Sequence, residues 1–248
     1  MKWPTDQPFN VEDRTILAGY MGSHSHGTYV APKDNGIDDK DIMGIYVPPK
    51  QYYLGLQKHD HIDCWVDDFD IVMYEAKKFM GLLLKNNPNV MGLLWLEPNL
   101  YVKKNRYGTA LIKNREIFSS KLAYKSFTGY AFSQLKKMSG SEFKGYMGDK
   151  RRKLVEKHGY DTKNAAHLIR LLRMGIEFLA TGELNVMRHD ASQLIDIKQG
   201  KYTLEEVKDM ANKLFPKAEE ALIHSKLPSR PDYKKAEELL IEIVENYI

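Results

Sequence analysis

The chain has 248 residues, of which 43% are hydrophobic, so one large domain or two modest ones can form a buried core. No run of 18 apolar residues occurs, and residues 1–6 lack the hydrophobic region of a signal peptide, so we expect no membrane span. The single cysteine, Cys64, excludes an internal disulfide and a cysteine-based zinc site, which favours a cytoplasmic protein. The net charge of +4 is compatible with nucleotide or nucleic-acid partners but does not require them.

The first third of the chain has the pattern of an α/β fold. We expect strands at residues 16–21, 42–47 and 65–72. A helix should follow at residues 74–85, where apolar residues recur at helical spacing. Pro48-Pro49 ends the second strand, because proline cannot donate to a strand ladder. Asn86-Asn87-Pro88-Asn89 ends the helix.

Strand signals fade after residue 100, and the remaining chain reads as helical. Helices are predicted at residues 111–118, 121–138, 161–180, from 203 onward and 231–247. A polar, glycine-containing break is expected at residues 139–145, and Thr203 with Glu206 predicts a capping box. The pattern predicts an α+β catalytic core at residues 1–100 and a helical substrate- and nucleotide-binding domain at residues 101–248.

Two short motifs near the N-terminus carry the strongest chemical signal. Gly22-Ser23 forms a small-residue turn after the first predicted strand, and such a turn can approach a phosphate closely. Asp39 and Asp41 open the second strand and point to the same face, because strand residues two apart share a face. Carboxylate oxygens are the ligands that Mg²⁺ prefers, so the two motifs together predict a metal–nucleotide site.

A site for two divalent ions typically needs a third carboxylate, and Asp70 is our candidate, with Asp68 in reserve. The expected chemistry is in-line attack of a hydroxyl on the α-phosphorus of a nucleotide. One ion would lower the pKa of the attacking hydroxyl, and the other would neutralise the triphosphate leaving group. Asp39, Asp41 and Asp70 are therefore the predicted catalytic and metal-binding residues.

Histidines offer a different metal site. If their segments are extended, the pair His24 and His26 and the pair His59 and His61 could join the aspartates in a metallohydrolase centre. Both pairs lie in turn or loop sequence, where phosphate or base contact, or simple loop polarity, explains them as well.

The helix predicted from residue 161 places charges among apolar residues. Positions 163, 167, 170 and 174 fall on one stripe, which carries Lys163, His167 and Arg170. Partner carboxylates or extension to solvent would explain these charges, and so would a cationic wall over a triphosphate or a nucleic-acid backbone. On the earlier helix, Lys78 is a further candidate for nucleotide binding.

The order of these motifs resembles the polymerase-β-type nucleotidyltransferase superfamily, and within it the nucleotidyltransferases associated with RNA repair in bacteria and phages. The resemblance spans roughly residues 14 to 235. It rests on Gly22-Ser23 with Gly27-Thr28, Asp39-x-Asp41-Ile42-x-Gly44-Ile45-x-Val47, Asp70-Ile71-Val72-x-Tyr74-Glu75, Asn87-Pro88-Asn89-Val90, Gly129-Tyr130-Ala131, residues 163–172 and Leu227-Pro228. One departure is Asp38-Asp39-Lys40-Asp41, where the superfamily usually has Ser-Asp-x-Asp or a close variant.

The resemblance implies a small mixed sheet with flanking helices, followed by a helical domain. It also implies that Gly22 and Ser23 bind nucleotide phosphates, that Asp39, Asp41 and Asp70 hold two Mg²⁺ or Mn²⁺ ions, and that Lys163, His167 and Arg170 line the cleft. The expected reaction transfers a nucleoside monophosphate from an NTP to a hydroxyl, with a tRNA-like RNA end as the first candidate acceptor. A non-catalytic nucleotide- or RNA-binding module and a His/Asp metallohydrolase are the alternatives.

Overall fold

The computed structural model describes residues 2–31, 38–139 and 149–248. Within them, five strands form one sheet in the order β3-β4-β2-β1-β5. The strands are β1 Thr15–Tyr20, β2 Lys40–Tyr46, β3 His61–Val66, β4 Phe69–Glu75 and β5 Tyr101–Lys104. The β2–β4 pair is parallel and the other pairs are antiparallel, so the sheet is mixed, as the sequence analysis expects.

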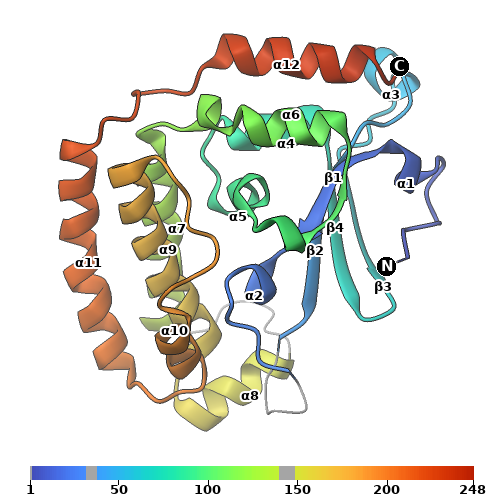
Figure 1. Ribbon diagram of the computed structural model, residues 1–248. Helices are drawn as coiled ribbons and strands as arrows, with labels where there is room; N and C mark the ends of the chain where they lie inside the picture. Colours follow the sequence, from blue (N-terminus) through green and yellow to red (C-terminus); the bar gives the residue numbers. More distant parts are fainter. Residues whose placement is uncertain (1, 32–37, 140–148) are drawn as a thin grey trace.

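Helices surround the sheet and form a second body beside it (Figure 1). Those in or next to the sheet region are α1 Val11–Arg14, α2 Gly22–Ser25, α3 Gln51–Leu54, α4 Ala76–Leu83, α5 Pro88–Met91, α6 Arg106–Lys113 and the 3-10 helices at Gly92–Trp95, Pro98–Leu100 and Arg115–Phe118. The later ones are α7 Leu122–Ser139, α8 Asp149–His158, α9 Thr162–Thr181, α10 Ala191–Lys198, α11 Leu204–His224 and α12 Tyr233–Glu245. Helix α9 packs between α7 and α11.

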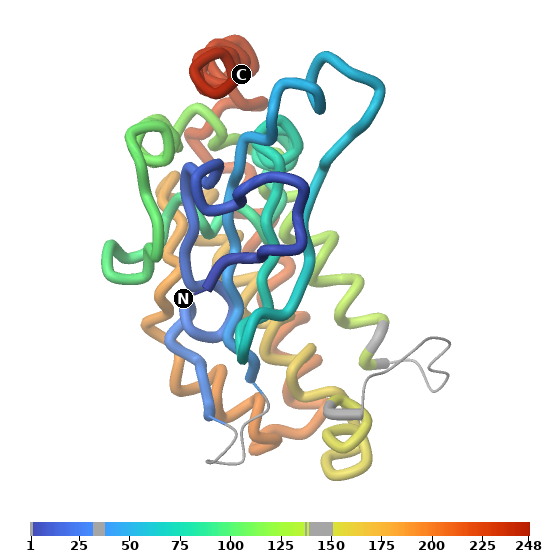
Figure 2. Tube along the Cα trace, turned by 90° about the vertical axis from the view of Figure 1, so that its right-hand side faces the viewer, coloured from blue at the N-terminus to red at the C-terminus, as the bar shows by residue number. Residues whose placement is uncertain are grey.

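The two faces of the sheet are covered by different parts of the chain. Leu17 and Ile45 point into the main core, which they share with Phe79 of α4 and with apolar residues of α7 and α9. Ile42 of β2 and Ile71 of β4 point to the opposite face. The N-terminal segment covers that face (Figure 2), where Trp3 and Phe9 pack on it.

The predicted third strand at residues 65–72 is wrong in its bounds. That stretch is the tip of a hairpin, in which β3 ends at Val66 and β4 begins at Phe69. Asp67 takes a positive φ of 54° at the turn, a conformation that aspartate tolerates better than most residues. Asp67 and Asp68 therefore form the connection between two strands, and Asp70 lies within β4.

Strand β5 is also missing from the sequence prediction. Its four residues, Tyr101–Lys104, are too few and too polar to stand out, and pairing with β1 stabilises them. The helix predicted at 74–85 begins at Ala76, because β4 continues to Glu75, whose side chain then caps α4. The stretch predicted as one helix at 111–118 divides between α6, which begins at Arg106, and a 3-10 helix.

The later helix predictions are confirmed in type and place. Helix α9 begins after the N-cap Asp161 and ends at Gly182, which has a left-handed φ of 79°. Helix α11 begins with the predicted capping box of Thr203 and Glu206. Of the break predicted at residues 139–145, Ser139 ends α7 and the other residues lie outside the described part.

The C-terminal helix returns to the sheet region, where α12 packs against α4. The Arg14 guanidinium donates to the Tyr247 carbonyl at 2.8 Å, and the Asn105 amide donates to the Tyr247 hydroxyl at 2.7 Å. Both β5 and α12 follow residue 100 in the sequence, yet both pack in the sheet region. The division of the chain at residue 100 therefore stays a prediction.

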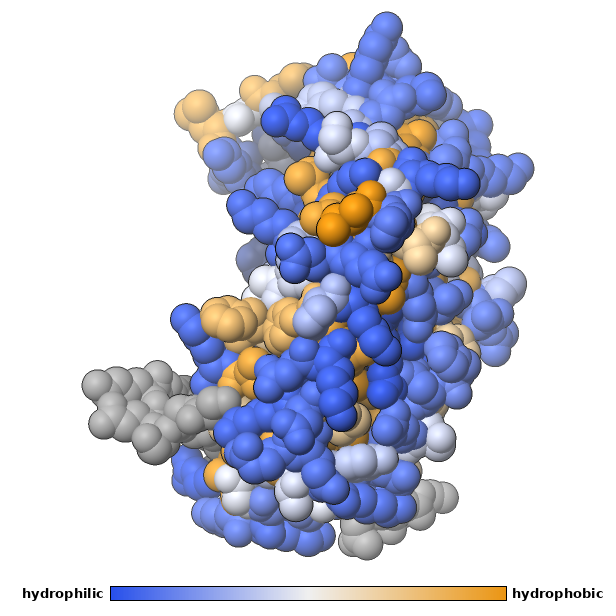
Figure 3. Space-filling model, turned by 90° about the vertical axis from the view of Figure 1, so that its left-hand side faces the viewer, coloured by the Kyte–Doolittle hydropathy of each residue, from blue (hydrophilic) through white to orange (hydrophobic). Residues whose placement is uncertain are grey.

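The outer side of the helical body is mostly hydrophilic, with apolar residues in small separate groups (Figure 3). Among the described residues, no helix combines the length and the apolar character needed to cross a membrane.

Candidate active site

The three predicted carboxylates lie together at one end of the parallel strand pair. Asp41 of β2 and Asp70 of β4 are direct partners in the register, and Asp39 precedes Asp41 by two residues. The pKa of Asp41 is raised to about 6, chiefly by burial; Lys163 lowers it, and the charges of Asp70, Asp39 and Asp38 add to the rise. Burial, Asp63 and Asp39 likewise raise the pKa of Asp70. Such crowding of carboxylates is favourable only where a cation can offset it.

Gly22 brings the backbone of the turn after β1 against this cluster. The Met21 amide donates to the Asp41 carbonyl at 2.9 Å, which fixes the start of α2 beside β2. Gly22 has a φ of 58°, and a Cβ placed on it would lie 1.8 Å from Asp41 Oδ2. Glycine is therefore required here for both its conformation and its lack of a side chain. Next to it, Ser23 Oγ is buried and has no hydrogen-bond partner among the described residues.

The cationic stripe of α9 faces the carboxylates across a cavity of about 370 Å³. The predicted residues Gly22, Ser23, Asp39, Asp41, Asp70, Lys163, His167 and Arg170 all line this cavity. Sequence reasoning had brought these residues together from the sheet and the helical region, and the fold places them around one space.

His26 holds Arg170 in place, and both of its ring nitrogens are used in doing so, which leaves none for a metal ion. His26 Nδ1 lies 3.0 Å from the Val186 carbonyl and donates to it, which leaves Nε2 to accept from the Arg170 guanidinium. Burial and the Arg170 charge lower the pKa of His26 well below its usual value, so the ring is neutral. Burial also lowers the pKa of Arg170 to about 9, and the guanidinium still stays charged at neutral pH.

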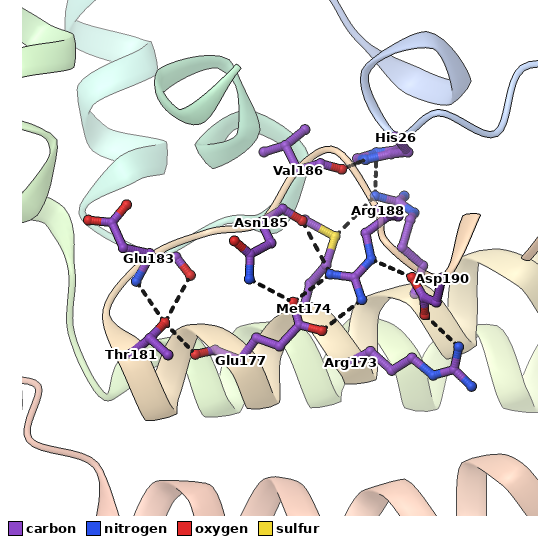
Figure 4. A network of polar contacts seen from close by, with 11 residues as sticks. His26, Arg173, Met174, Glu177, Thr181, Glu183, Asn185, Val186, Arg188 and Asp190 are labelled. Carbon is purple, nitrogen blue, oxygen red and sulfur yellow. Dashed lines mark hydrogen bonds and ion pairs between the residues drawn. The ribbon is translucent and has the colours of Figure 1, made fainter. Parts of the chain in front are cut away.

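A buried ion-pair network ties the connection between α9 and α10 to this arrangement (Figure 4). The fully buried Arg188 side chain donates to both oxygens of Glu177, at 2.6 and 2.7 Å, and to Asp190 at 2.8 Å. The Arg188 backbone amide also donates to the His26 carbonyl at 3.3 Å. The network thus fixes the segment that carries Val186, and through His26 it fixes Arg170.

Sequence reasoning missed a second buried pair that closes the cavity. Asp38 is 3% exposed and accepts hydrogen bonds from the Val30 amide at 2.8 Å and from Lys198 of α10. Lys163 Nζ lies 3.8 Å from the other Asp38 oxygen. The only signal in the sequence was the extra acid of Asp38-Asp39-Lys40-Asp41, because Lys198 lies 160 residues away.

Comparison with models of protein families gives a match over residues 6–242, to the RNA repair pathway DNA polymerase beta family. The chain belongs to that family. The resemblance drawn from the motifs is thereby confirmed, and membership indicates nucleotidyl transfer as the class of activity.

Among solved structures, the chain matches a nucleotidyltransferase-like protein from Exiguobacterium sibiricum 255-15, with 12% sequence identity. The match covers 94% of this chain and 74% of that one, with a TM-score of 0.30, which is too low to support an argument. Comparison with curated proteins gives no match.

Two of the predicted site residues of this RNA repair family member, Lys78 and the reserve carboxylate Asp68, lie outside the cavity. Lys78 lines a separate hollow at the other end of β4, with Tyr53 and His59, so the structure does not bring it to the carboxylates. The reserve carboxylate Asp68 sits in the β3–β4 turn and pairs with Lys40. The Lys40 side chain therefore points away from Asp39 and Asp41, over the Phe69 ring.

The remaining histidines do not assemble around the aspartates. His59 uses both ring nitrogens, with Nδ1 2.6 Å from the Tyr46 hydroxyl and Nε2 3.0 Å from Gln7 Oε1. His61 is exposed and pairs with Tyr74, at the end of β4 away from Asp70. The His24 ring packs 3.9 Å from the Tyr29 ring. The metallohydrolase alternative therefore lacks its ligand set.

The family implies divalent metal, and the residues present fit it. Asp39, Asp41 and Asp70 offer hard oxygen ligands, and burial together with the neighbouring carboxylate charges raises the pKa of Asp41. Across the described residues, no group of three His, Cys, Asp or Glu side chains is already arranged to hold a metal ion. The donors are thus of the right kind and in the right place without being preassembled.

Proposed function

We propose that the protein is a metal-dependent nucleotidyltransferase that transfers a nucleoside monophosphate from an NTP to a hydroxyl at an RNA end. The observation that carries the proposal is the cavity in which Asp39, Asp41 and Asp70 face Lys163 and Arg170. An acidic wall for metal and a cationic wall for phosphate, on two sides of one space, suit a metal-bound triphosphate.

Each wall has a defined task. Ser23 Oγ, buried and without a partner among the described residues, donates to a phosphate oxygen, and Lys163 and Arg170 pair with the charges of the triphosphate. Gly22 lets the backbone approach without a Cβ. Asp39, Asp41 and Asp70 would hold Mg²⁺, which when bound activates the attacking hydroxyl and neutralises charge on the leaving group.

The transfer conserves atoms and charge in one displacement. The acceptor hydroxyl oxygen bonds to the α-phosphorus as the bond from that phosphorus to the α–β bridging oxygen breaks, and pyrophosphate leaves. Asp70, whose pKa is raised by burial and by Asp63 and Asp39, accepts the hydroxyl proton at its carboxylate. The cations of α9 hold the departing pyrophosphate.

The acceptor is assigned from family membership and charge. The family is described by an RNA repair pathway, and this chain carries a net charge of +4. A non-catalytic binding module is the second candidate, but the complete set of three aspartates favours transfer, because binding alone does not need them.

The test is incubation with each α-³²P-labelled NTP, Mg²⁺ and total cellular RNA. We expect label to enter RNA with the wild-type protein, and Asp39→Ala and Asp41→Ala each to abolish labelling while their circular dichroism stays unchanged. Lys78→Ala is the matched control, because Lys78 lies in a different hollow. Labelling that persists in either aspartate variant would refute the assignment.

A further inference from the structure

A large aromatic side chain stands in solvent beside the carboxylates. Trp65 of β3 is 59% exposed, whereas the other large apolar residues of the sheet are mostly buried in the two cores. Leaving an indole in water forgoes the stabilisation that burial of its large surface would give. A single exposed apolar residue is common on protein surfaces, and Trp65 is notable for its place beside a catalytic residue.

The strand register places Trp65 directly against a catalytic residue. Trp65 is the cross-strand partner of Asp70, and directly opposed residues of an antiparallel pair point to the same face. β3 is an edge strand of the sheet, so no strand of the described residues lies beyond Trp65. Trp65 is therefore a neighbour of Asp70 on the same face, at the edge of the sheet, although it is not part of the cavity lining itself.

The charges around the cavity favour a polyanion as the occupant. Helix α8 places Arg151, Arg152, Lys153 and Lys157 on the surface, and its two acidic residues are Asp149 and Glu156. Arg151 lines the same cavity as Asp70 and donates to Asn164 at 2.9 Å. A ligand that extends from the cavity over the edge of the sheet thus meets the aromatic face of Trp65 and the cationic helix α8. This combination binds single-stranded nucleic acid.

We propose that Trp65 is the stacking platform for the terminal base of a single-stranded RNA acceptor. The inference rests on the proposed function and adds the acceptor subsite to it. The terminal base lies on the indole, the following phosphates pair with α8, and the terminal hydroxyl is presented to Asp70. Stacking on an aromatic face tolerates every base, so the subsite selects a free, unpaired end rather than a sequence.

The first test is equilibrium binding of a short single-stranded RNA, which needs no catalysis. Stacking of one base contributes enough that Trp65→Ala should bind the RNA about 5- to 150-fold more weakly. Trp65→Phe should keep most of the affinity, because it keeps an aromatic face. The control is Tyr233→Ala on α12, which removes a 65% exposed aromatic far from the carboxylates and should change nothing.

The second test pairs the variant with an altered RNA. An RNA whose terminal nucleotide lacks its base should bind the wild-type protein as weakly as the intact RNA binds Trp65→Ala, and Trp65→Ala should not distinguish the two RNAs. Equal affinity of wild-type protein and Trp65→Ala for intact RNA would overturn the proposal.

A transfer assay tests the proposed function separately from the Trp65 subsite. Transfer from labelled NTP should show an increased KM for RNA in Trp65→Ala, with the KM for NTP unchanged. If the wild-type protein transfers no label, the proposed function fails, while the binding measurements still decide on Trp65. If Trp65→Ala transfers label with an unchanged KM for RNA, the subsite alone is refuted.

Discussion

The Asp41 carboxylate shows how a binding site is kept at the expense of stability. Its pKa is raised to about 6 by burial and by three neighbouring aspartates, so the folded chain binds this proton more tightly than the unfolded chain does. Stability therefore falls as pH rises from about 4 to 6 and stays lowered above that range. In a nucleotidyltransferase, a bound cation would offset this cost.

Asp41→Asn should consequently stabilise the protein without metal. We expect a gain of about 1–2 kcal/mol in the free energy of unfolding at pH 7.5, allowing for the partial exposure of the site, and no gain below pH 4. Thermal unfolding across this pH range measures it. Mg²⁺ should raise the Tm of the wild-type protein and not that of the variant; a variant that is less stable than wild type at pH 7.5 would contradict this account.

Gly22 allows a sharper steric test. Gly22→Ala should abolish transfer and cost about 1–3 kcal/mol, because the left-handed φ is strained for alanine and the new Cβ collides with Asp41 Oδ2. Gly129→Ala on α7 is the matched control, since a Cβ there meets no atom within 4 Å. It should stabilise the helix by about 0.5–1 kcal/mol. Activity retained in Gly22→Ala would show that the turn does not approach phosphate.

Local chemistry made the acidic residues predictable. Strand alternation brought Asp39 and Asp41 to one face, and the next strand supplied Asp70. The same reasoning could not find Asp38 with Lys198, or His26 with Arg170, because those pairs form between segments more than 140 residues apart. They become neighbours because α9 and α10 contact His26 and Thr28, which follow α2, and Asp38, which precedes β2.

At the scale of elements, the connection between α9 and α10 positions the cationic wall. Arg188, with its side chain fully buried, is the centre of that segment, and its loss would leave Glu177 without its ion-pair partner and Asp190 with Arg173 alone. Removing one member of a buried ion pair is far costlier than removing an exposed one, because the remaining charge stays desolvated.

Arg188→Ala should therefore destabilise the protein by about 3–5 kcal/mol and weaken NTP binding, since His26 and Arg170 lose their support. Lys201→Ala, which breaks the exposed pair with Asp196, should cost less than about 1 kcal/mol. Denaturant unfolding measures both. Similar losses in the two variants would mean that the network does not hold this connection.

The elements themselves were predictable to different degrees. The long amphipathic helices α7, α9 and α11 follow from apolar spacing and caps, which are local signals. The β3–β4 hairpin and β5 were not, because a short strand at a sheet edge depends on its partner more than on its own residues. The hairpin matters most for function, since its register sets Trp65 beside Asp70.

At the scale of the whole molecule, the chain crosses between the sheet and the helical body several times. Helix α12 returns to α4, and the Lys121 amide donates to the Pro228 carbonyl at 2.8 Å. The three tryptophans, Trp3, Trp65 and Trp95, all lie in the first 100 residues, whereas most long helices come later. Trp3 and Trp65 thus report the sheet region and Trp95 reports its contact with Phe178 of α9, whereas the circular dichroism signal at 222 nm reports mainly the helices.

These crossings predict one cooperative unfolding transition. The Tm from tryptophan fluorescence and the Tm from circular dichroism at 222 nm should coincide, and an NTP with Mg²⁺ should raise both equally, because its site uses residues from both parts. Two separate transitions would instead support independent domains divided near residue 100.

The central claim is that this cavity transfers the α-phosphoryl group of an NTP with its nucleoside, and paired labels test it most directly. Wild-type protein is incubated with RNA, Mg²⁺ and the same NTP labelled at either the α- or the γ-phosphorus. We predict that α-label becomes bound to RNA while γ-label is released as pyrophosphate, and that Asp41→Asn does neither. Transfer of γ-label to RNA, or release of γ-label as inorganic phosphate without α-labelled RNA, would contradict the account.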